Sequence, residues 1–379
     1  PKAVNSSLWG IFSLRNSMAQ NTTRLLNLDI LRLVSAVLVL AYHYGFRMEV
    51  TGEGGGTGFP EFAPAAVWLD SGLLIFFAIS GYVITLSAEG RTAFDFAVGR
   101  VARLWPTFIL CASATAIVLC SWPVVGVPTP TVKQWLAHLV INARALGQPF
   151  LDGAYWTIAY EVMFYGWVFV FIALGWFKKY WQALVVCWLA LSVANELLIG
   201  SEVLRKLFIT EYSGYFVFGM TLYKLRQEQT PGALFILAAS VLWATATPFI
   251  IEPKFYEMYG IHRSAAGLAL IGPIAVSCVA LCIMLPALPI GPAIAMGIGG
   301  LTYPLYLLHQ HIGYATFARF GAAHSRWLVG AILVATLLFA SWLIATFVEP
   351  PARRFISNFA RRTATAISIR RAKPQSQIP

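Results

Sequence analysis

Residues 29–46 read DILRLVSAVLVLAYHYGF, an apolar run that contains one acidic, one basic and one histidine side chain. An α-helix of this length is about 27 Å long, close to the roughly 30 Å thickness of a bilayer's hydrocarbon core. The stretch therefore predicts a membrane-spanning helix that carries ionisable groups within it.

Nine more apolar stretches follow, at about 67–88, 105–123, 154–175, 180–199, 211–224, 233–251, 265–285, 298–319 and 327–348. The chain is 58% hydrophobic and 11% charged, whereas soluble proteins average about 45–50% apolar and about 25% charged residues. A water-soluble globule is therefore excluded. We predict an all-α, polytopic membrane protein, in which residues 29–348 form a bundle of about ten transmembrane helices.

The basic residues indicate the orientation of this bundle. An even number of spans puts both termini on the same side of the membrane. When the loops are assigned alternately to the two sides, most Lys and Arg residues fall on the side of the termini. Cytoplasmic loops carry an excess of Lys and Arg. We therefore expect a cytoplasmic N-terminal segment at 1–28, in which 1–17 is an extension before a natural start at Met18, and a basic cytoplasmic tail at 349–379.

Two classes of ligand are not expected, nucleic acid and metal ions. The formal net charge is +11, but much of the excess lies in the basic tail, where it can bind the anionic headgroups of membrane lipid. The five cysteines lie inside apolar stretches and lack the paired spacing of metal ligands.

The ionisable residues of the first span face one way. Arg32 and His43 are about 20° apart after three full helical turns, and Asp29 lies on the same stripe. Small side chains lie between Arg32 and His43, which are roughly 16 Å apart along the axis, so an extended ligand has room. Polar groups within a span are costly, so both are functional candidates, while Asp29 is expected to orient Arg32. A histidine satisfied by a neighbouring helix is the alternative for His43.

Arg100 and Arg103 stand near the start of the third span. Their i and i+3 spacing presents both guanidinium groups on one side of a helix, a geometry suited to phosphate oxygens. Anchoring to lipid phosphate is the alternative. Because Arg32 comes from the same side of the membrane, the three arginines form a candidate site for a phosphate-bearing nucleotide cofactor.

The fourth span contains an acidic residue, Glu161, which shares a helix face with Thr157 and is flanked by Trp156 and Tyr160. Counted from the opposite membrane surface, Glu161 lies at a depth comparable with that of His43. It is expected either to pair with an arginine or to act with His43 as an acid, a base or an orienting group.

Two other spans contribute polar groups. Ser80 precedes Gly81 in the second span, a pair that permits close helix approach, so packing is the favoured role of Ser80. In the ninth span Tyr303, Tyr306 and His309 fall on one broad face that can line a polar cavity. These residues alone fit two classes of protein: an enzyme, or a transporter or flippase of a lipid-linked or anionic substrate.

From about residue 25 to 355 the chain resembles the acyltransferase type 3 family of integral membrane acyltransferases. No single motif is specific, but their order and spacing together are. The matching features are Leu28 to Arg32 with His43 as an Arg-x10-His pattern, Phe76 to Tyr82, Arg100-x-x-Arg103, Trp156 to Tyr165 with Glu161, Tyr303 to His309, and Glu349-Pro350. One departure is Thr157, where the family more often has Ser.

The resemblance implies a ten-helix enzyme, multi-pass in the bacterial cytoplasmic (inner) membrane. It would transfer an acyl group, commonly acetyl, from cytoplasmic acyl-CoA to a hydroxyl of a cell-envelope or exported carbohydrate. Polysaccharides such as lipopolysaccharide and exopolysaccharide suit this role, as does a lipid-linked acceptor. Acyl-CoA is then the donor substrate, and no cofactor is bound permanently.

The resemblance also assigns roles to residues. His43 would be the central catalytic residue, either as a base or as a transiently acylated group, and Glu161 would fix its tautomer or bind the sugar. Acyl-CoA would be held by Arg32, Arg100 and Arg103. The supporting or substrate-lining residues would be Asp29, Ser80, Trp156, Thr157, Tyr160, Tyr303 and His309.

The predicted orientation can be tested with reporter fusions. Reporters at the N- and C-termini should report a cytoplasmic position, and a reporter in the 124–153 loop an external one, because an even number of spans separates the termini. An external C-terminus would be incompatible with ten spans.

Overall fold

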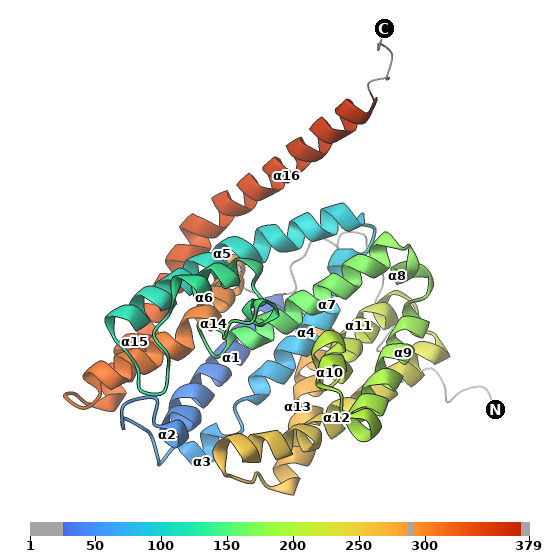
Figure 1. The fold of residues 1–379 in the computed structure, drawn as a ribbon. Coiled ribbons are helices and arrows are strands. Elements are labelled where there is room, and N and C mark those ends of the chain that lie inside the picture. The colour runs from blue at the N-terminus through green and yellow to red at the C-terminus, as the bar shows by residue number, and fades with distance from the viewer. Residues whose placement is uncertain (1–25, 287, 289–291, 373–379) are drawn as a thin grey trace.

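The computed structural model describes residues 26–286, 288 and 292–372. The expected extension at 1–17, the rest of the N-terminal segment as far as residue 25, and residues 373–379 of the tail lie outside the described residues. The described residues form helices joined by turns, with no β-strand among them, so the all-α prediction is confirmed (Figure 1).

Helices lie at all ten predicted positions. They are α1 (Leu26–Tyr42), α4 (Ser71–Ala88), α5 (Ala93–Ser121), α7 (Tyr155–Ala173), α9 (Trp181–Ala194), α11 (Ser213–Gln227), α12 (Pro231–Tyr259), α13 (Ala265–Met284), α14 (Pro292–Phe320) and α15 (Arg326–Leu343). In the described part of the chain, eight helical stretches are long and apolar enough to cross a membrane, and α11 and α14 are not among them. The chain is thus an all-helical, multi-pass membrane protein, and ten crossings stay a prediction.

Shorter elements connect these helices. The short helices are α2 (Met48–Thr51), α3 (Ala63–Ala66), α6 (Val132–Ala137), α8 (Trp176–Lys179) and α10 (Glu202–Phe208), with 3-10 turns η4 (His138–Val140) and η5 (Ala143–Leu146). Three π-helical turns, η3 (His43–Arg47), η6 (Asn195–Ile199) and η7 (Ile344–Val348), directly follow α1, α9 and α15. Such turns often occur at functional sites, and the first begins at His43.

Helix α5 begins earlier than the predicted start near residue 105, which is wrong by about three turns. Thr92 caps the helix, because its hydroxyl oxygen accepts a hydrogen bond from the backbone N–H of Asp95 at 3.1 Å. Arg100 and Arg103 therefore lie within α5 and not at its entrance. The 29 residues of α5 span about 43 Å, longer than a hydrocarbon core, so both arginines can still lie near a membrane surface.

The basic tail is helical. Helix α16 (Glu349–Ala372) continues from α15 through η7 and projects away from the bundle beyond α5 (Figure 1). It is tied to the start of α5 by an ion pair between Arg361 and Asp95 at 3.8 Å. The tail thus extends the last span instead of forming an unstructured segment, at least as far as Ala372.

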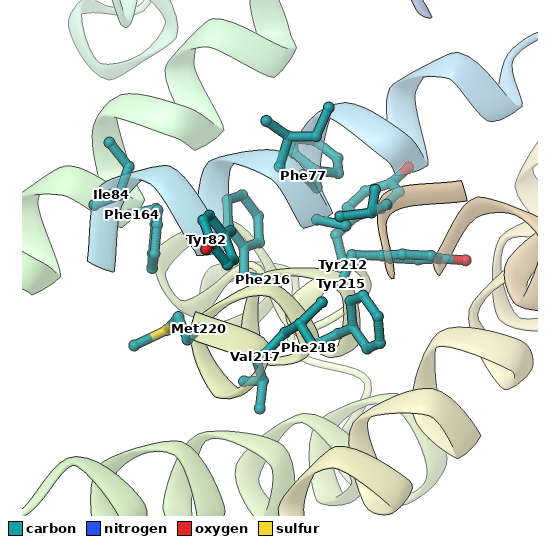
Figure 2. Close-up of a cluster of buried hydrophobic side chains, with 14 of the residues drawn as sticks. Phe77, Tyr82, Ile84, Phe164, Tyr212, Tyr215, Phe216, Val217, Phe218 and Met220 are labelled. Carbon is teal, nitrogen blue, oxygen red and sulfur yellow. The ribbon is translucent and has the colours of Figure 1, made fainter. Parts of the chain in front are cut away.

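Helix α11 lies at the centre of the larger hydrophobic core. Figure 2 shows its aromatic side chains on several sides of the helix, with Phe216 toward α4 and α7, and Tyr215 away from α7, where its hydroxyl donates to the carbonyl oxygen of Ala244 on α12. The ring of Phe216 lies 4.9 Å from that of Phe77 on α4 and 4.5 Å from that of Phe164 on α7. Most residues of α11 are buried, which explains how a helix of only 15 residues keeps its place.

Two glycines allow α4 and α11 to approach closely. A Cβ at Gly81 would meet the backbone of Phe216, and a Cβ at Gly219 would meet the backbone of Ala78 and Tyr82. The obstacle in both cases is backbone, which cannot move aside as a flexible side chain can. The close approach expected at Gly81 is confirmed, and its partner is α11.

We predict that Gly81→Ala or Gly219→Ala destabilises the bundle by about 1–3 kcal/mol, the usual cost of overpacking. The matched control is Gly166→Ala on α7, where an added Cβ meets no atom within 4 Å. Thermal unfolding of the purified proteins in detergent should show a lower midpoint for the first two variants only. Equal midpoints for all three would refute the close-packing argument.

Candidate active site

Two cavities lie among the helices that carry the predicted site residues. The first, here called the arginine cavity, has a volume of about 150 Å³ and is lined by Arg32, Ser80, Arg100, Arg103, Thr157, Glu161, Tyr165, Tyr303 and Tyr306, among others. The second, the histidine cavity, has a volume of about 1010 Å³, and its lining includes His43, Arg47, Asp70, Trp156, Thr157, Tyr160, Glu211, Lys254 and Tyr306.

The arginine cavity is rich in positive charge. Arg32 on α1 is held by Asp29, whose carboxylate lies 3.5 Å from the guanidinium, as the i, i+3 spacing predicts. The guanidinium of Arg100 lies over the ring of Tyr165 at 5.8 Å. Among the described residues, no carboxylate lies within ion-pair distance of Arg100 or Arg103. The hydrogen-bonding capacity of both is therefore available to a ligand, and phosphate oxygens are the groups that match it best.

Glu161 is the acidic member of this cavity. Its Oε1 atom accepts hydrogen bonds from the hydroxyl of Ser80, at 2.9 Å, and from the hydroxyl of Tyr165. Ser80 thus does more than the packing role expected of it, because it fixes the carboxylate of α7 against α4. Three arginines and one glutamate leave the lining positively charged.

His43 is held by a residue of α14. It begins η3, is 8% exposed, and lines the histidine cavity. Its Nδ1 atom lies 3.1 Å from the hydroxyl oxygen of Tyr314. Because Nδ1 is engaged in this contact, Nε2 is the nitrogen left for a ligand.

A second imidazole, His309, lies beside the first. The two ring centroids are 5.0 Å apart, and His309 lines neither cavity. The Nδ1 atom of His309 lies 2.7 Å from the carbonyl oxygen of Tyr306, which can only accept, so Nδ1 carries the proton. Its Nε2 is a buried acceptor with no hydrogen-bond partner among the described residues.

The histidine cavity combines aromatic rings with paired charges. The rings of Trp156, Tyr160 and Tyr212 form a cluster with centroids 5.3 to 6.1 Å apart. Lys254 lies 2.9 Å from Glu211. Such walls offer flat apolar faces next to many hydrogen-bonding groups.

Arg47 adds a second charge pair to this cavity. It follows His43 by one turn and binds the carboxylate of Glu53 with two nitrogens, at 3.2 and 3.3 Å. A third nitrogen donates to the hydroxyl of Tyr259 on α12 at 3.1 Å. Arg47 therefore joins the end of α1 to α12 in the wall beside His43.

The structure brings most predicted site residues together, but it does not join Glu161 to His43. The arginine cavity collects Arg32, Arg100, Arg103, Glu161, Ser80, Thr157 and Tyr303, and the histidine cavity collects His43, Trp156, Tyr160 and again Thr157. Glu161 turns toward Ser80 and Tyr165, so Tyr314 occupies the place beside the His43 ring that Glu161 was expected to take.

Sequence reasoning missed Tyr314, although a signal was present. Tyr314 follows Tyr303 by eleven residues and so lies on the same stripe of α14, the spacing that also relates His43 to Arg32. No such signal marks three other residues of the histidine cavity, because their partners come from other elements: Arg47, Asp70 and Glu211. In the described part of the chain, no three His, Cys, Asp or Glu side chains are grouped to hold a metal ion.

Comparison with known proteins identifies the family of the chain. A search of curated proteins and a search of solved structures each found no match. The family model described as an acyltransferase domain matches residues 25–346, which include both cavities and every predicted site residue. The chain therefore belongs to the acyltransferase type 3 family.

Proposed function

We propose that the protein is an O-acyltransferase that moves an acyl group, commonly acetyl, from acyl-CoA to a hydroxyl of a carbohydrate. The observation that carries the proposal is the junction of two unlike cavities, one positively charged and one that presents His43, in a chain of an acyltransferase family. A transporter would need no such division of chemistry between the two cavities.

The arginine cavity would hold the donor. CoA is a polyanion, and Arg32, Arg100 and Arg103 offer planar donors that bind phosphate in pairs of hydrogen bonds. Its thin pantetheine arm would then run along α1 toward His43, over the roughly 16 Å that separate the two residues on the helix axis. We place this cavity on the cytoplasmic side, where acyl-CoA is made.

The histidine cavity would hold the acceptor. The ring cluster of Trp156, Tyr160 and Tyr212 provides faces on which a sugar ring can stack, and the charged groups beside it can bind sugar hydroxyls. Its volume of about 1010 Å³ suits a sugar of a larger glycan, whether polymeric or lipid-linked. We place this cavity on the outer side of a bacterial cytoplasmic membrane.

The chemistry follows from the position of His43. The Nε2 atom accepts the proton of the acceptor hydroxyl while the hydroxyl oxygen attacks the thioester carbonyl carbon. The carbon–sulfur bond breaks, and the CoA thiolate takes the proton from His43. Tyr314 holds Nδ1 during both transfers, and Glu161 orders the donor side through Ser80.

We predict that His43→Ala abolishes acyl transfer, because no other group would take the proton from the acceptor. The test compares the surface glycans of a deletion strain, complemented with parent or variant, by mass spectrometry. The parent should restore an acyl increment, whose mass identifies the group, and His43→Ala should not.

The matched control is His324→Ala, since His324 is an exposed histidine outside both cavities. It should restore the increment like the parent, with equal protein levels in the membrane. Restoration by His43→Ala would remove His43 from the mechanism. No acyl increment in the parent would contradict the proposed function itself.

We predict that Arg103→Lys weakens acyl-CoA binding by roughly tenfold. Lysine retains the charge but loses the paired hydrogen bonds to phosphate, worth about 1.5 kcal/mol. The measurement is binding of acetyl-CoA to detergent-purified proteins. Arg91→Lys, a change at an exposed arginine outside the arginine cavity, should bind like the parent. Equal affinity of the parent and Arg103→Lys would show that Arg103 does not clamp phosphate.

A further inference from the structure

The wall of the histidine cavity contains a second histidine, His311 on α14, which the proposed proton transfer does not use. Its side chain is buried, and its Nδ1 atom lies 2.8 Å from the carbonyl oxygen of Leu151. A carbonyl oxygen can only accept, so Nδ1 carries the proton of the neutral ring and Nε2 is a bare acceptor. Among the described residues, no group donates a hydrogen bond to this Nε2. Its lone pair is therefore available to a ligand in the cavity.

The end of the 124–153 loop is folded around this imidazole. The carboxylate of Asp152 accepts a hydrogen bond from the backbone N–H of His311 at 2.9 Å. Asp152 is fully buried, and a buried carboxylate is costly unless such donors satisfy it. Next to it, a Cβ at Gly153 would meet the side chain of Gln310, so the loop and α14 are in close contact. The loop is thus fixed to the helix at the position of the histidine.

The carbonyl group that receives the Nδ1 proton is fixed as well. The backbone N–H of Leu151 donates to Nε2 of His138 at 3.0 Å. The Nδ1 atom of His138 in turn donates to the carbonyl oxygen of Gln134 on α6 at 2.8 Å. A chain of three hydrogen bonds therefore connects the ring of His311 to α6. A side chain held in this way loses little conformational freedom when a ligand binds to it.

His311 lies on the acceptor side of the boundary between the two cavities. Tyr306 marks that boundary, because it lines both cavities and its hydroxyl lies 2.8 Å from that of Thr157, which also lines both. His311 follows Tyr306 by five residues, about 7.5 Å along the helix axis, and lines only the histidine cavity. No residue of the 124–153 loop lines the arginine cavity. The ligand that reaches Nε2 of His311 is therefore the acceptor and not the CoA phosphates.

We propose that His311 binds the acceptor, and that its Nε2 accepts a hydrogen bond from a second hydroxyl of the sugar whose first hydroxyl reacts at His43. Both imidazoles lie beside the ring of Tyr314, with centroid distances of 6.3 Å for His43 and 5.9 Å for His311. One acceptor molecule can therefore contact both. The inference rests on the proposed function. It narrows the acceptor from any alcohol to a compound in which a free hydroxyl accompanies the acylated one.

Two substitutions separate the roles of the two ring nitrogens. In His311→Asn the amide nitrogen takes the place of Nδ1 and can still donate to Leu151, but the side chain is too short to supply an acceptor at the position of Nε2. In His311→Gln an amide oxygen reaches the position of Nε2, and the donor at the position of Nδ1 is lost. A purely structural role of His311 predicts that Asn is tolerated and Gln is not. Acceptor binding predicts the reverse.

The test uses detergent-purified enzyme, with glycan extracted from the deletion strain as the acceptor. Release of CoA from saturating acetyl-CoA is measured at increasing glycan concentration, after subtraction of the release without glycan. His311→Asn should raise the KM for glycan roughly tenfold, the effect of one lost hydrogen bond, and leave kcat and acetyl-CoA binding unchanged. His311→Gln should restore most of the affinity. The matched control, His324→Asn, should keep the parental KM.

Three results overturn the role of His311 and leave acyl transfer standing. The first is a parental KM in His311→Asn, and the second is a higher KM in His311→Gln than in His311→Asn. The third is a loss of kcat as large as that of His43→Ala with KM unchanged, because His311 would then transfer a proton instead of binding the acceptor.

A further pair of variants decides if His311→Asn does not reach the membrane. His311→Gln and His311→Met have side chains of similar length, and only glutamine provides a strong acceptor. The KM for glycan should then be roughly tenfold higher in His311→Met, and equal values overturn the proposal. Absence of glycan-dependent CoA release by the parent overturns the proposed function instead.

Discussion

The carboxylate of Glu161 is the interaction around which the site is built. An acidic group inside a membrane protein is costly unless other polar groups satisfy it. Ser80 on α4 and Tyr165 on α7 donate hydrogen bonds to it, so the need for partners fixes the two helices together. The same carboxylate lies in a cavity with three arginines, whose mutual repulsion it reduces. A single charged residue thereby sets both the packing of α4 against α7 and the electrostatics of the arginine cavity.

The helix that carries Ser80 is itself held mainly by close packing against α11. Gly81, the next residue, lets α11 approach α4 until backbone meets backbone, and the ring of Phe216 on α11 packs against Phe77 of α4 and Phe164 of α7 (Figure 2). Such close packing restricts sliding of α4 along its neighbours. The position of the Ser80 hydroxyl, and with it that of the Glu161 carboxylate, therefore depends on Gly81, which does not itself line the arginine cavity.

The sequence was informative wherever one helix carried the information. The stripe from Asp29 through Arg32 to His43 follows from helical periodicity, and the Asp29–Arg32 contact is present. It was uninformative where partners belong to different elements. Depth counted along α7 placed Glu161 level with His43. The carboxylate turns instead toward Ser80, a contact that depends on α4. The contact of Tyr314 with His43 depends in the same way on α14. The start of α5 was missed because a single capping threonine, Thr92, extends the helix beyond its apolar stretch.

The hydrogen-bonded pair of Thr157 and Tyr306, which lines both cavities, has an electrical consequence. Two polar cavities that opened into each other through a membrane protein would form a continuous file of water, along which protons and other ions could move. Thr157 and Tyr306 are almost fully buried, and their hydroxyl groups are hydrogen-bonded to each other. Their packed side chains therefore interrupt such a file of water. Because this pair closes the boundary between the two cavities, polar sites can lie inside a membrane protein without becoming a path for ions.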